Sequence, residues 1–264
     1  MNLELLTKQV ANLSRAVGNY IKNEIKNLDP SDIKHKGVND FVTYVDHTSE
    51  NRLVAELGKL LPEAGFIAEE DSSHKKQEKF NWIIDPLDGT TNFVHGIPLY
   101  SISIALVKRE QIVSGVIFEI NQHECFYAWQ NGGAYLNGHK IEVSKTNLLK
   151  ESLVATGFPY TDFSRIDAYN EVFLYLMKNS HGIRRLGSAA VDLAYVACGR
   201  FDTFYEYGLH SWDVAAGALI VEEAGGIVTD FNGGRKFLAE REIIASNPNI
   251  HNEFLELVRK KFYE

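Results

Sequence analysis

The segment Asp85-Pro86-Leu87-Asp88-Gly89-Thr90-Thr91 follows residues 82–84, a short apolar run typical of a β-strand. Because Pro86 has no N–H to donate to a ladder, we expect the chain to leave the sheet there. Two carboxylates three residues apart then crowd the strand end, and they repel each other unless a cation neutralises them. Gly89 and Thr90 offer backbone N–H groups and a hydroxyl, which suit a phosphate where a helix begins. The segment therefore predicts metal-assisted phosphate chemistry.

The overall charge limits the classes of function that fit the chain. Its 264 residues, 45% hydrophobic and 23% charged, have the composition of a soluble globular protein with a sizeable core. The net charge of −8 and the pI of about 5.6 argue against a general nucleic-acid binder, which usually has a basic excess. An acidic enzyme that acts on anions needs a bound divalent cation, because the cation inverts the local charge.

The cysteines and the N-terminus indicate the compartment. Cys125 and Cys198 are far apart and form no metal-binding or redox spacing, so we expect reduced thiols. Glu4 stands where a signal peptide would carry basic residues followed by an apolar stretch. No apolar run approaches the roughly 20 residues of a membrane span. We therefore expect a cytoplasmic protein that binds neither membranes nor nucleic acid directly.

Helical and strand patterns mix along the whole chain. Apolar residues recur every three or four positions over 6–28, and Asp29-Pro30 stops that helix. Further helices are expected over 48–61, 167–177, 189–198, 212–224 and 249–262. Strands are expected over 41–45, 66–68, 82–84, 101–107, 112–118, 125–129, 134–136, 153–158, 184–186, 201–205, 227–229 and 243–245, with Gly-containing turns at 131–133 and 137–138. The pattern predicts a layered α/β or α+β fold.

Other acids lie beside expected element ends. Glu69 and Glu70 follow a short strand, and taken alone they fit solvated loop residues. Asp213 opens a strongly apolar helix, where it fits a helix cap and a functional acid equally well.

Several known acid-rich or phosphate-handling motifs do not match. An EF-hand loop needs Gly sixth and Glu twelfth, but counting from Asp85 the chain has Gly89 fifth and Gly96 twelfth. Phosphatases with an aspartyl nucleophile place their acids two residues apart rather than three. The sequence contains no Walker A, G-x-G-x-x-G or G-x-S-x-G motif, and Cys198-Gly199-Arg200 lacks the anion loop of cysteine phosphatases. Attack by a metal-activated water fits better than a covalent intermediate.

Three separated segments together resemble the inositol monophosphatase family of magnesium-dependent, lithium-sensitive phosphatases. They are Glu69-Glu70, the Asp85–Thr91 segment and Trp212-Asp213-Val214-Ala215-Ala216-Gly217. The resemblance implies a single domain with the layered α-β-α-β-α sandwich of the inositol monophosphatase and fructose-1,6-bisphosphatase type, classed as α+β. It also implies an N-terminal lobe to about residue 145, a C-terminal lobe from about 146 to 264, and a homodimer.

The resemblance further implies which residues hold two or three Mg²⁺ ions. Glu69, Asp85 and the Leu87 carbonyl would hold the first ion. Asp85, Asp88 and Asp213 would hold the second, and a third, weaker ion would use Glu69 and waters. Ala68 stands where many relatives have Gly, so we expect a backbone that avoids positive φ there.

Catalytic and substrate contacts follow from the same resemblance. Thr90, paired with Asp46, would orient the attacking water together with Glu69, and the N–H groups of Gly89 and Thr90 would bind phosphate. The residues implied to contact substrate are Asp88, Gly89, Thr90, Gly187, Ser188, Ala189, Glu206 and Asp213. Asp46 also fits an ordinary helix cap, and Glu206 also fits a surface acid between two tyrosines.

The expected reaction is hydrolysis of a small phosphate monoester, with myo-inositol 1-phosphate as the first substrate to test. Fructose 1,6-bisphosphate, adenosine 3′,5′-bisphosphate, NADP and histidinol phosphate remain open, because the metal chemistry is shared. Glu206 favours a neutral polyol, since its charge would repel a second phosphate. An interaction protein of a transcription complex that retains the site also remains open.

Overall fold

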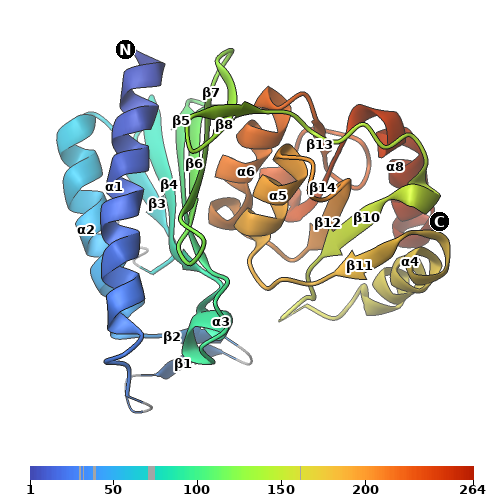
Figure 1. The fold of residues 1–264 in the computed structure, drawn as a ribbon, viewed down its shortest axis with the longest axis horizontal. Coiled ribbons are helices and arrows are strands. Elements are labelled where there is room, and N and C mark those ends of the chain that lie inside the picture. The colour runs from blue at the N-terminus through green and yellow to red at the C-terminus, as the bar shows by residue number, and fades with distance from the viewer. Residues whose placement is uncertain (30, 32, 38–39, 71–74, 161) are drawn as a thin grey trace.

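The computed structural model has five layers in which helices and sheets alternate (Figure 1). Helices α1 (Leu3–Glu24) and α2 (Tyr44–Leu60) cover one sheet, and α5 (Ala189–Ala197) and α6 (Ser211–Glu223) lie between the two sheets. Helices α4 (Ile166–Asn179) and α8 (Pro248–Tyr263) cover the far face of the second sheet. The structure describes residues 1–29, 31, 33–37, 40–70, 75–160 and 162–264, and the side chains of 35–37, 40 and 41 lie outside that description. The predicted α-β-α-β-α sandwich is confirmed.

The first sheet has seven strands in the order β3-β4-β5-β6-β7-β8-β9. They are β3 (Gly65–Ala68), β4 (Phe80–Asp88), β5 (Ser101–Lys108), β6 (Gln111–Glu119), β7 (Glu124–Trp129), β8 (Gly133–Leu136) and β9 (His139–Ile141). Strands β3 and β4 are parallel, and all later neighbours are antiparallel. Asn131 and Asn137 adopt positive φ angles of 61° and 50°, as the predicted tight turns require.

Strand β4 does not end at Pro86, and that prediction was wrong. Asp85 lies opposite Ser103 and Asp88 lies opposite Ser101, so three steps along β4 match two steps along β5. The extra residue forms a bulge, and a bulge accommodates a residue that cannot donate to the ladder. The strand therefore continues past Pro86 and carries both carboxylates at its end.

The second sheet has five strands in the order β11-β10-β12-β14-β13. They are β10 (Leu153–Thr156), β11 (Gly182–Arg184), β12 (Thr203–Tyr207), β13 (Ile227–Thr229) and β14 (Glu242–Ser246). Strand β10 is parallel to β11 and β12, and β14 is antiparallel to β12 and β13. The remaining elements are a hairpin of β1 (Lys34–Gly37) and β2 (Asp40–Val42), helices α3 (Thr90–Val94) and α7 (Phe237–Glu240), and a 3-10 turn η2 (Leu149–Glu151).

Helix α2 begins four residues before the expected Thr48, and the strand expected over 41–45 ends at Val42, three residues early. Thr43 is its N-cap: the Thr43 hydroxyl accepts from the Val45 N–H, and the Asp46 carboxylate accepts from the Thr43 N–H at 2.8 Å. This capping box satisfies two N–H groups that a helix end would otherwise leave unpaired. β-Branched residues concealed the helix start, because they are typical of strands.

The core has three parts: one between the two sheets and one on the outer face of each sheet. The stripe of apolar residues on α1 packs with α2 against one face of the seven-stranded sheet, around buried Trp82 and Phe118. Helices α5 and α6 are largely apolar around their whole circumference, because they are enclosed between the two sheets. The third part lies where α4 and α8 cover the five-stranded sheet, around Tyr169 and Phe254.

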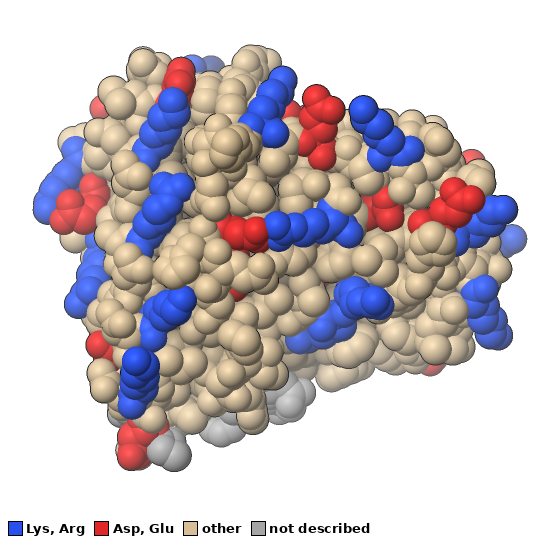
Figure 2. Space-filling view, in the orientation of Figure 1, with Lys and Arg blue, Asp and Glu red and all other residues tan. Residues whose placement is uncertain are grey.

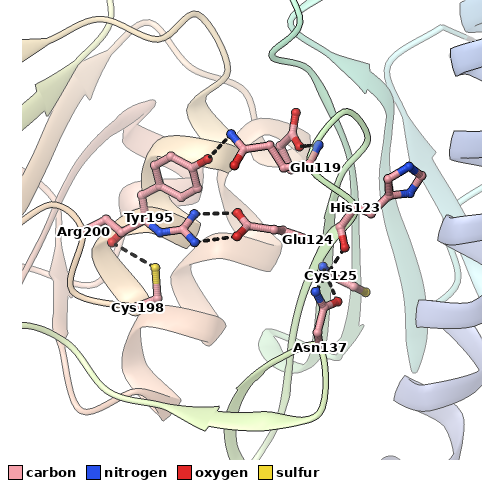
Figure 3. A network of polar contacts seen from close by, with 9 residues as sticks. Glu119, His123, Glu124, Cys125, Asn137, Tyr195, Cys198 and Arg200 are labelled. Atoms are coloured by element: carbon pink, nitrogen blue, oxygen red, sulfur yellow. Dashed lines mark hydrogen bonds and ion pairs between the residues drawn. The ribbon is translucent and has the colours of Figure 1, made fainter.

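Polar contacts join the first sheet to the α5 region (Figure 3). Arg200, which follows α5, donates two hydrogen bonds of 2.5 Å to the Glu124 carboxylate on β7. The Tyr195 hydroxyl of α5 accepts from the Gln122 amide at 3.2 Å. These contacts link the C-terminal end of α5 to the first sheet.

Charge is unevenly distributed over the surface. Lys8, Arg15 and Lys22 recur every seven residues on α1, and Figure 2 shows a column of basic side chains over that helix. The acidic excess of the chain therefore lies elsewhere. Among the described residues, no helix combines the length and the hydropathy needed to cross a membrane.

Candidate active site

The end of β4 brings Asp85 into the interior. Its side chain is 2% exposed, and its Oδ1 accepts a hydrogen bond of 2.9 Å from the Leu87 N–H. Burial raises the pKa of Asp85 well above its ordinary value, and the charges of Glu69, Asp88 and Asp213 raise it further. A carboxyl held in this way binds a proton or a cation more readily than an exposed one.

Asp88 joins the first sheet to the start of α5. Its Oδ2 accepts hydrogen bonds from the Ser188 hydroxyl at 2.5 Å and from the Ala190 N–H at 2.8 Å. Burial raises the pKa of Asp88 to about 6, although the hydrogen bonds from Ser188 and Ala190 oppose that shift. Two donors at a helix N-terminus thus hold one oxygen of this carboxylate in place.

Asp213 is both a cap and a member of the acidic group. It is the third residue of α6, and its Oδ2 accepts from the His210 N–H at 2.6 Å. Burial raises the pKa of Asp213 well above its ordinary value, and the charge of Asp88 raises it further. Glu69 lies just past β3, where its N–H donates to the Ile84 carbonyl of β4 at 3.3 Å.

Thr90 and Asp46 are paired in the structure. The Thr90 hydroxyl lies 3.1 Å from Asp46 Oδ1 and 2.9 Å from the Leu87 carbonyl, so its proton is shared between two acceptors. Asp46 is 1% exposed, and its other oxygen accepts from the Thr43 N–H and hydroxyl. The capping role and the pairing with Thr90 therefore coexist in one carboxylate.

Gly89 permits a close approach between β4 and the Gly187 turn. Its φ is +99°, which L side chains rarely adopt. A Cβ at this position would lie 3.2 Å from both the Gly187 carbonyl oxygen and Tyr100 Cβ. Asn92 braces the same approach, since its amide donates to the Leu186 carbonyl at 2.8 Å.

Glu206 lies on β12 and is not a surface acid, since only 5% of it is exposed. Burial raises its pKa well above the ordinary value, while the Arg185 charge lowers it. Its carboxyl group occupies the space beside Gly157, where a Cβ would lie 2.1 Å from the carboxyl atoms. The turn before α5 faces the same region, with Ser188 as the N-cap of that helix.

All of the predicted site residues except Asp46 line one cavity of about 270 Å³. They come from the ends of β3, β4 and β12 and from the starts of α3, α5 and α6. The predicted residues in the lining are Glu69, Asp85, Leu87, Asp88, Gly89, Thr90, Gly187, Ser188, Ala189, Glu206 and Asp213. Asp46 reaches the cavity only through Thr90.

The cavity also contains residues that the sequence did not single out, notably Asp192, Arg185 and Tyr160. Asp192 follows Ser188 by four residues, which places both on one face of α5. Asp192 is the one acidic residue in the otherwise apolar helix Ala189–Ala197, and the sequence could have identified it on that ground. Such an acid is rarely buried without a reason.

The group of acids fits a hard divalent cation. Glu69, Asp85, Asp88 and Asp213 are close enough for each charge to act on a neighbour. Across the described part of the chain, no three Asp, Glu, His or Cys side chains form a closed ligand cluster. Without a cation, repulsion and burial both disfavour ionised carboxylates, and a divalent ion removes both penalties. Carboxylate, carbonyl and water oxygens are the ligands that Mg²⁺ prefers.

Comparison with known sequences identifies relatives over nearly the whole chain. A sequence model described as the inositol monophosphatase family matches residues 2–263. A protein of Pseudomonas aeruginosa named Nus factor SuhB is 40% identical over 251 residues, which cover 93% of each chain. An inositol-1-monophosphatase of Mesorhizobium japonicum is 40% identical over 238 residues, covering 90% of this chain and 88% of the relative.

Solved structures share the same architecture. The extragenic suppressor protein SuhB of Bartonella henselae superposes with a TM-score of 0.90 at 37% identity, covering 98% of this chain and 99% of that one. An IMPase of Thermotoga maritima gives a TM-score of 0.87 at 36% identity, with 95% of each chain covered. The relatives thus carry two kinds of name, one enzymatic and one from transcription.

Proposed function

This chain belongs to the inositol monophosphatase family, and from that premise we propose that it hydrolyses a small phosphate monoester in a magnesium-dependent reaction. The substrate we propose first is myo-inositol 1-phosphate. The observation that carries the proposal is the meeting of four carboxyl groups with the Thr90–Asp46 pair at one cavity.

The metal ligands are part of the proposal. Glu69, Asp85 and the Leu87 carbonyl would hold one Mg²⁺, and Asp85, Asp88 and Asp213 would hold a second. A third ion would use Glu69. Bound Mg²⁺ lowers the pKa of water and stabilises the charge that develops on phosphate and leaving oxygens.

Thr90 and Asp46 would hold the attacking water in place. Because the Thr90 hydroxyl directs its proton toward Asp46 and the Leu87 carbonyl, its lone pairs remain able to accept a hydrogen bond from water. Glu69, which lines the same cavity, would supply a second acceptor. Attack by water in this position needs no covalent intermediate on the protein.

Substrate binding divides between two sides of the cavity. The N–H groups of Gly89 and Thr90 stand at the beginning of α3, where a helical turn leaves N–H groups without an intrahelical acceptor, and they would bind phosphate. Gly187, Ser188, Ala189 and Glu206 would face the alcohol. The proximity of Glu206 favours a neutral alcohol over one that carries a second phosphate.

Phosphate release from myo-inositol 1-phosphate, with and without Mg²⁺, tests the proposal. The wild type should release phosphate only with Mg²⁺, and Asp88→Asn should lose nearly all activity. Fructose 1,6-bisphosphate and NADP belong in the same assay. If phosphate is released only from one of these two compounds, the proposed metal chemistry stands and the proposed substrate changes. No Mg²⁺-dependent release from any ester would refute the phosphatase proposal.

A second role in a transcription complex is favoured by one observation, the relatives named Nus factor SuhB. It does not compete with hydrolysis, since the carboxylates are intact. Affinity purification of the tagged wild type and of Asp88→Asn from the native cells, followed by mass spectrometry, tests it. Transcription proteins recovered equally with both variants would support a role independent of turnover, and their absence from both would refute it.

We also propose a homodimer, on family grounds alone. Sedimentation of the purified protein at micromolar concentration measures the mass directly. A species of about 60 kDa, twice the 29.8 kDa of the chain, is expected.

A further inference from the structure

Asp192 is a buried acid in the cavity wall that no step above uses. It is 1% exposed, and within the described structure its Oδ1 has no hydrogen-bond partner. A buried carboxyl oxygen without a donor costs free energy, so folded proteins seldom keep one unless something else satisfies it. Asp192 lines the cavity, so the wall of the cavity contains this unsatisfied acceptor.

A second carboxyl faces the same space. Glu206 is 5% exposed and lines the same cavity, and its charge acts on Asp192. Burial raises the pKa of both acids well above the ordinary value. The wall beyond the phosphate side therefore presents two carboxyl groups from different layers, one on α5 and one on β12.

One cation stands beside this pair. Arg185 lowers the pKa of both acids by its charge, and its guanidinium donates to the Tyr160 hydroxyl. The Arg185 Nε has no partner in the described structure. The wall thus offers carboxyl oxygens and one unpaired N–H donor.

We infer that Asp192 forms, with Glu206, a subsite that accepts hydrogen bonds from at least two hydroxyl groups of the substrate alcohol. Hydroxyl groups are both donors and acceptors, so they match carboxyl oxygens and the Arg185 N–H together. A second phosphate on the alcohol would find carboxyl oxygens rather than donors at this wall, so the subsite disfavours it. This inference rests on the proposed phosphatase function, and it makes Asp192 a specificity-determining residue for polyol esters.

The discriminating pair of substrates is myo-inositol 1-phosphate and cyclohexyl phosphate. Both carry phosphate on a six-membered ring, and only the first has ring hydroxyls. A site built to bind hydroxyls rejects an analogue that lacks them, because its buried polar groups are then left unpaired. The wild type should therefore prefer the inositol ester in kcat/KM by roughly 100-fold or more.

Asp192→Ala should reduce that preference by about 10- to 100-fold, mainly through KM for the inositol ester, because one acceptor is lost. The Mg²⁺-dependent hydrolysis of cyclohexyl phosphate should change less than about threefold, since that ester makes no such contact. Asp192→Asn retains an acceptor oxygen, so its preference for the inositol ester should lie between those of the wild type and Asp192→Ala. The exposed Asp167→Ala on α4 is the matched control and should leave both substrates unaffected.

Thermal unfolding separates this role from a structural one. Removing a buried acceptor that lacks a partner should leave the midpoint of Asp192→Ala unchanged or raised, whereas a structural acid would lower it. Equal losses on both esters, or an unchanged preference, would overturn the inference while leaving the phosphatase proposal intact. Failure of the wild type on both esters with Mg²⁺ would instead refute the proposed function and the inference with it.

Discussion

The Thr90 hydroxyl lies 3.1 Å from the Asp46 carboxylate, which joins the first turn of α3 to the first turn of α2 across 44 residues of sequence. In a capping box, the carboxylate of the third helical residue accepts from the N-cap N–H. Here one oxygen serves the cap and the other fixes a hydroxyl at the cavity. The position of Thr90 therefore depends on how α2 begins.

Asp46→Asn should lower kcat by about 10²- to 10⁴-fold, the usual contribution of a positioned proton acceptor, and leave KM nearly unchanged. The measurement is steady-state hydrolysis of the inositol ester. Thr43→Ala is the control, because it removes a cap at a cost of about 1 kcal/mol and spares the Thr90 contact. Equal kinetics for the two variants would show that the carboxylate acts only as a cap.

Gly157→Ala should raise KM for a polyol ester, because its Cβ would lie 2.1 Å from the Glu206 carboxyl and displace it. Gly58→Ala is the matched control in α2, where the nearest atom to the new Cβ is 3.9 Å away. That control should stabilise the protein by about 0.5–1 kcal/mol and leave KM unchanged. Kinetics and thermal unfolding of both variants test this, and a normal KM for Gly157→Ala would contradict it.

The metal-free protein should lose stability as the pH rises toward neutrality. The folded-state pKa of Asp88 is raised to about 6 from an ordinary value of 3.8, and Asp85 and Asp213 shift in the same direction. The folded state then binds more protons than the unfolded state, so this stability is present below the unfolded pKa and is lost as the pH rises through about 6.

Thermal midpoints with EDTA, measured from pH 5 to 7, should fall more for the wild type than for Asp88→Asn, which has one fewer acid to ionise. Mg²⁺ binds the ionised carboxylates, so its stabilising effect on the wild type should grow over the same range. A pH dependence identical in both proteins would refute this account.

The ion pair between Arg200 and Glu124 should contribute little to stability in spite of its two short hydrogen bonds. The Arg200 side chain is 39% exposed, and solvent weakens such pairs. A double-mutant cycle with Arg200→Gln and Glu124→Gln in urea should give a coupling of about 1 kcal/mol or less. The more exposed pair Lys59–Glu56 is the control, with a smaller coupling expected. A coupling above about 3 kcal/mol would indicate a buried pair instead.

Local patterns predicted most helices and strands and a layered mixed fold, whereas the five-layer sandwich and most of the site residues came from the resemblance to the family. Alternating strands, amphipathic helices and Gly-containing turns specify themselves within a few residues. The Thr90–Asp46 pairing, which came from family resemblance, is present in the structure. Ala68 avoids positive φ as expected, since it is absent from the residues with that backbone conformation.

The errors arise where distant parts of the chain decide the outcome. Pro86 by itself predicts a strand end, but β4 continues to pair with β5 because a bulge accommodates Pro86. The cap at Thr43 was hidden by strand-forming neighbours. Asp192 gains its significance only because β12 brings Glu206 beside α5, which no local pattern reveals.

The hydrogen bonds from Ser188 and Ala190 to Asp88 have a consequence during synthesis on the ribosome. Three of the four clustered acids are made early, and Asp213 is made more than 100 residues later. A nascent chain that has completed only the first sheet holds Asp88 without its partners and lacks Asp213. The complete group of acids therefore forms only after α6 has been synthesised and has packed between the two sheets.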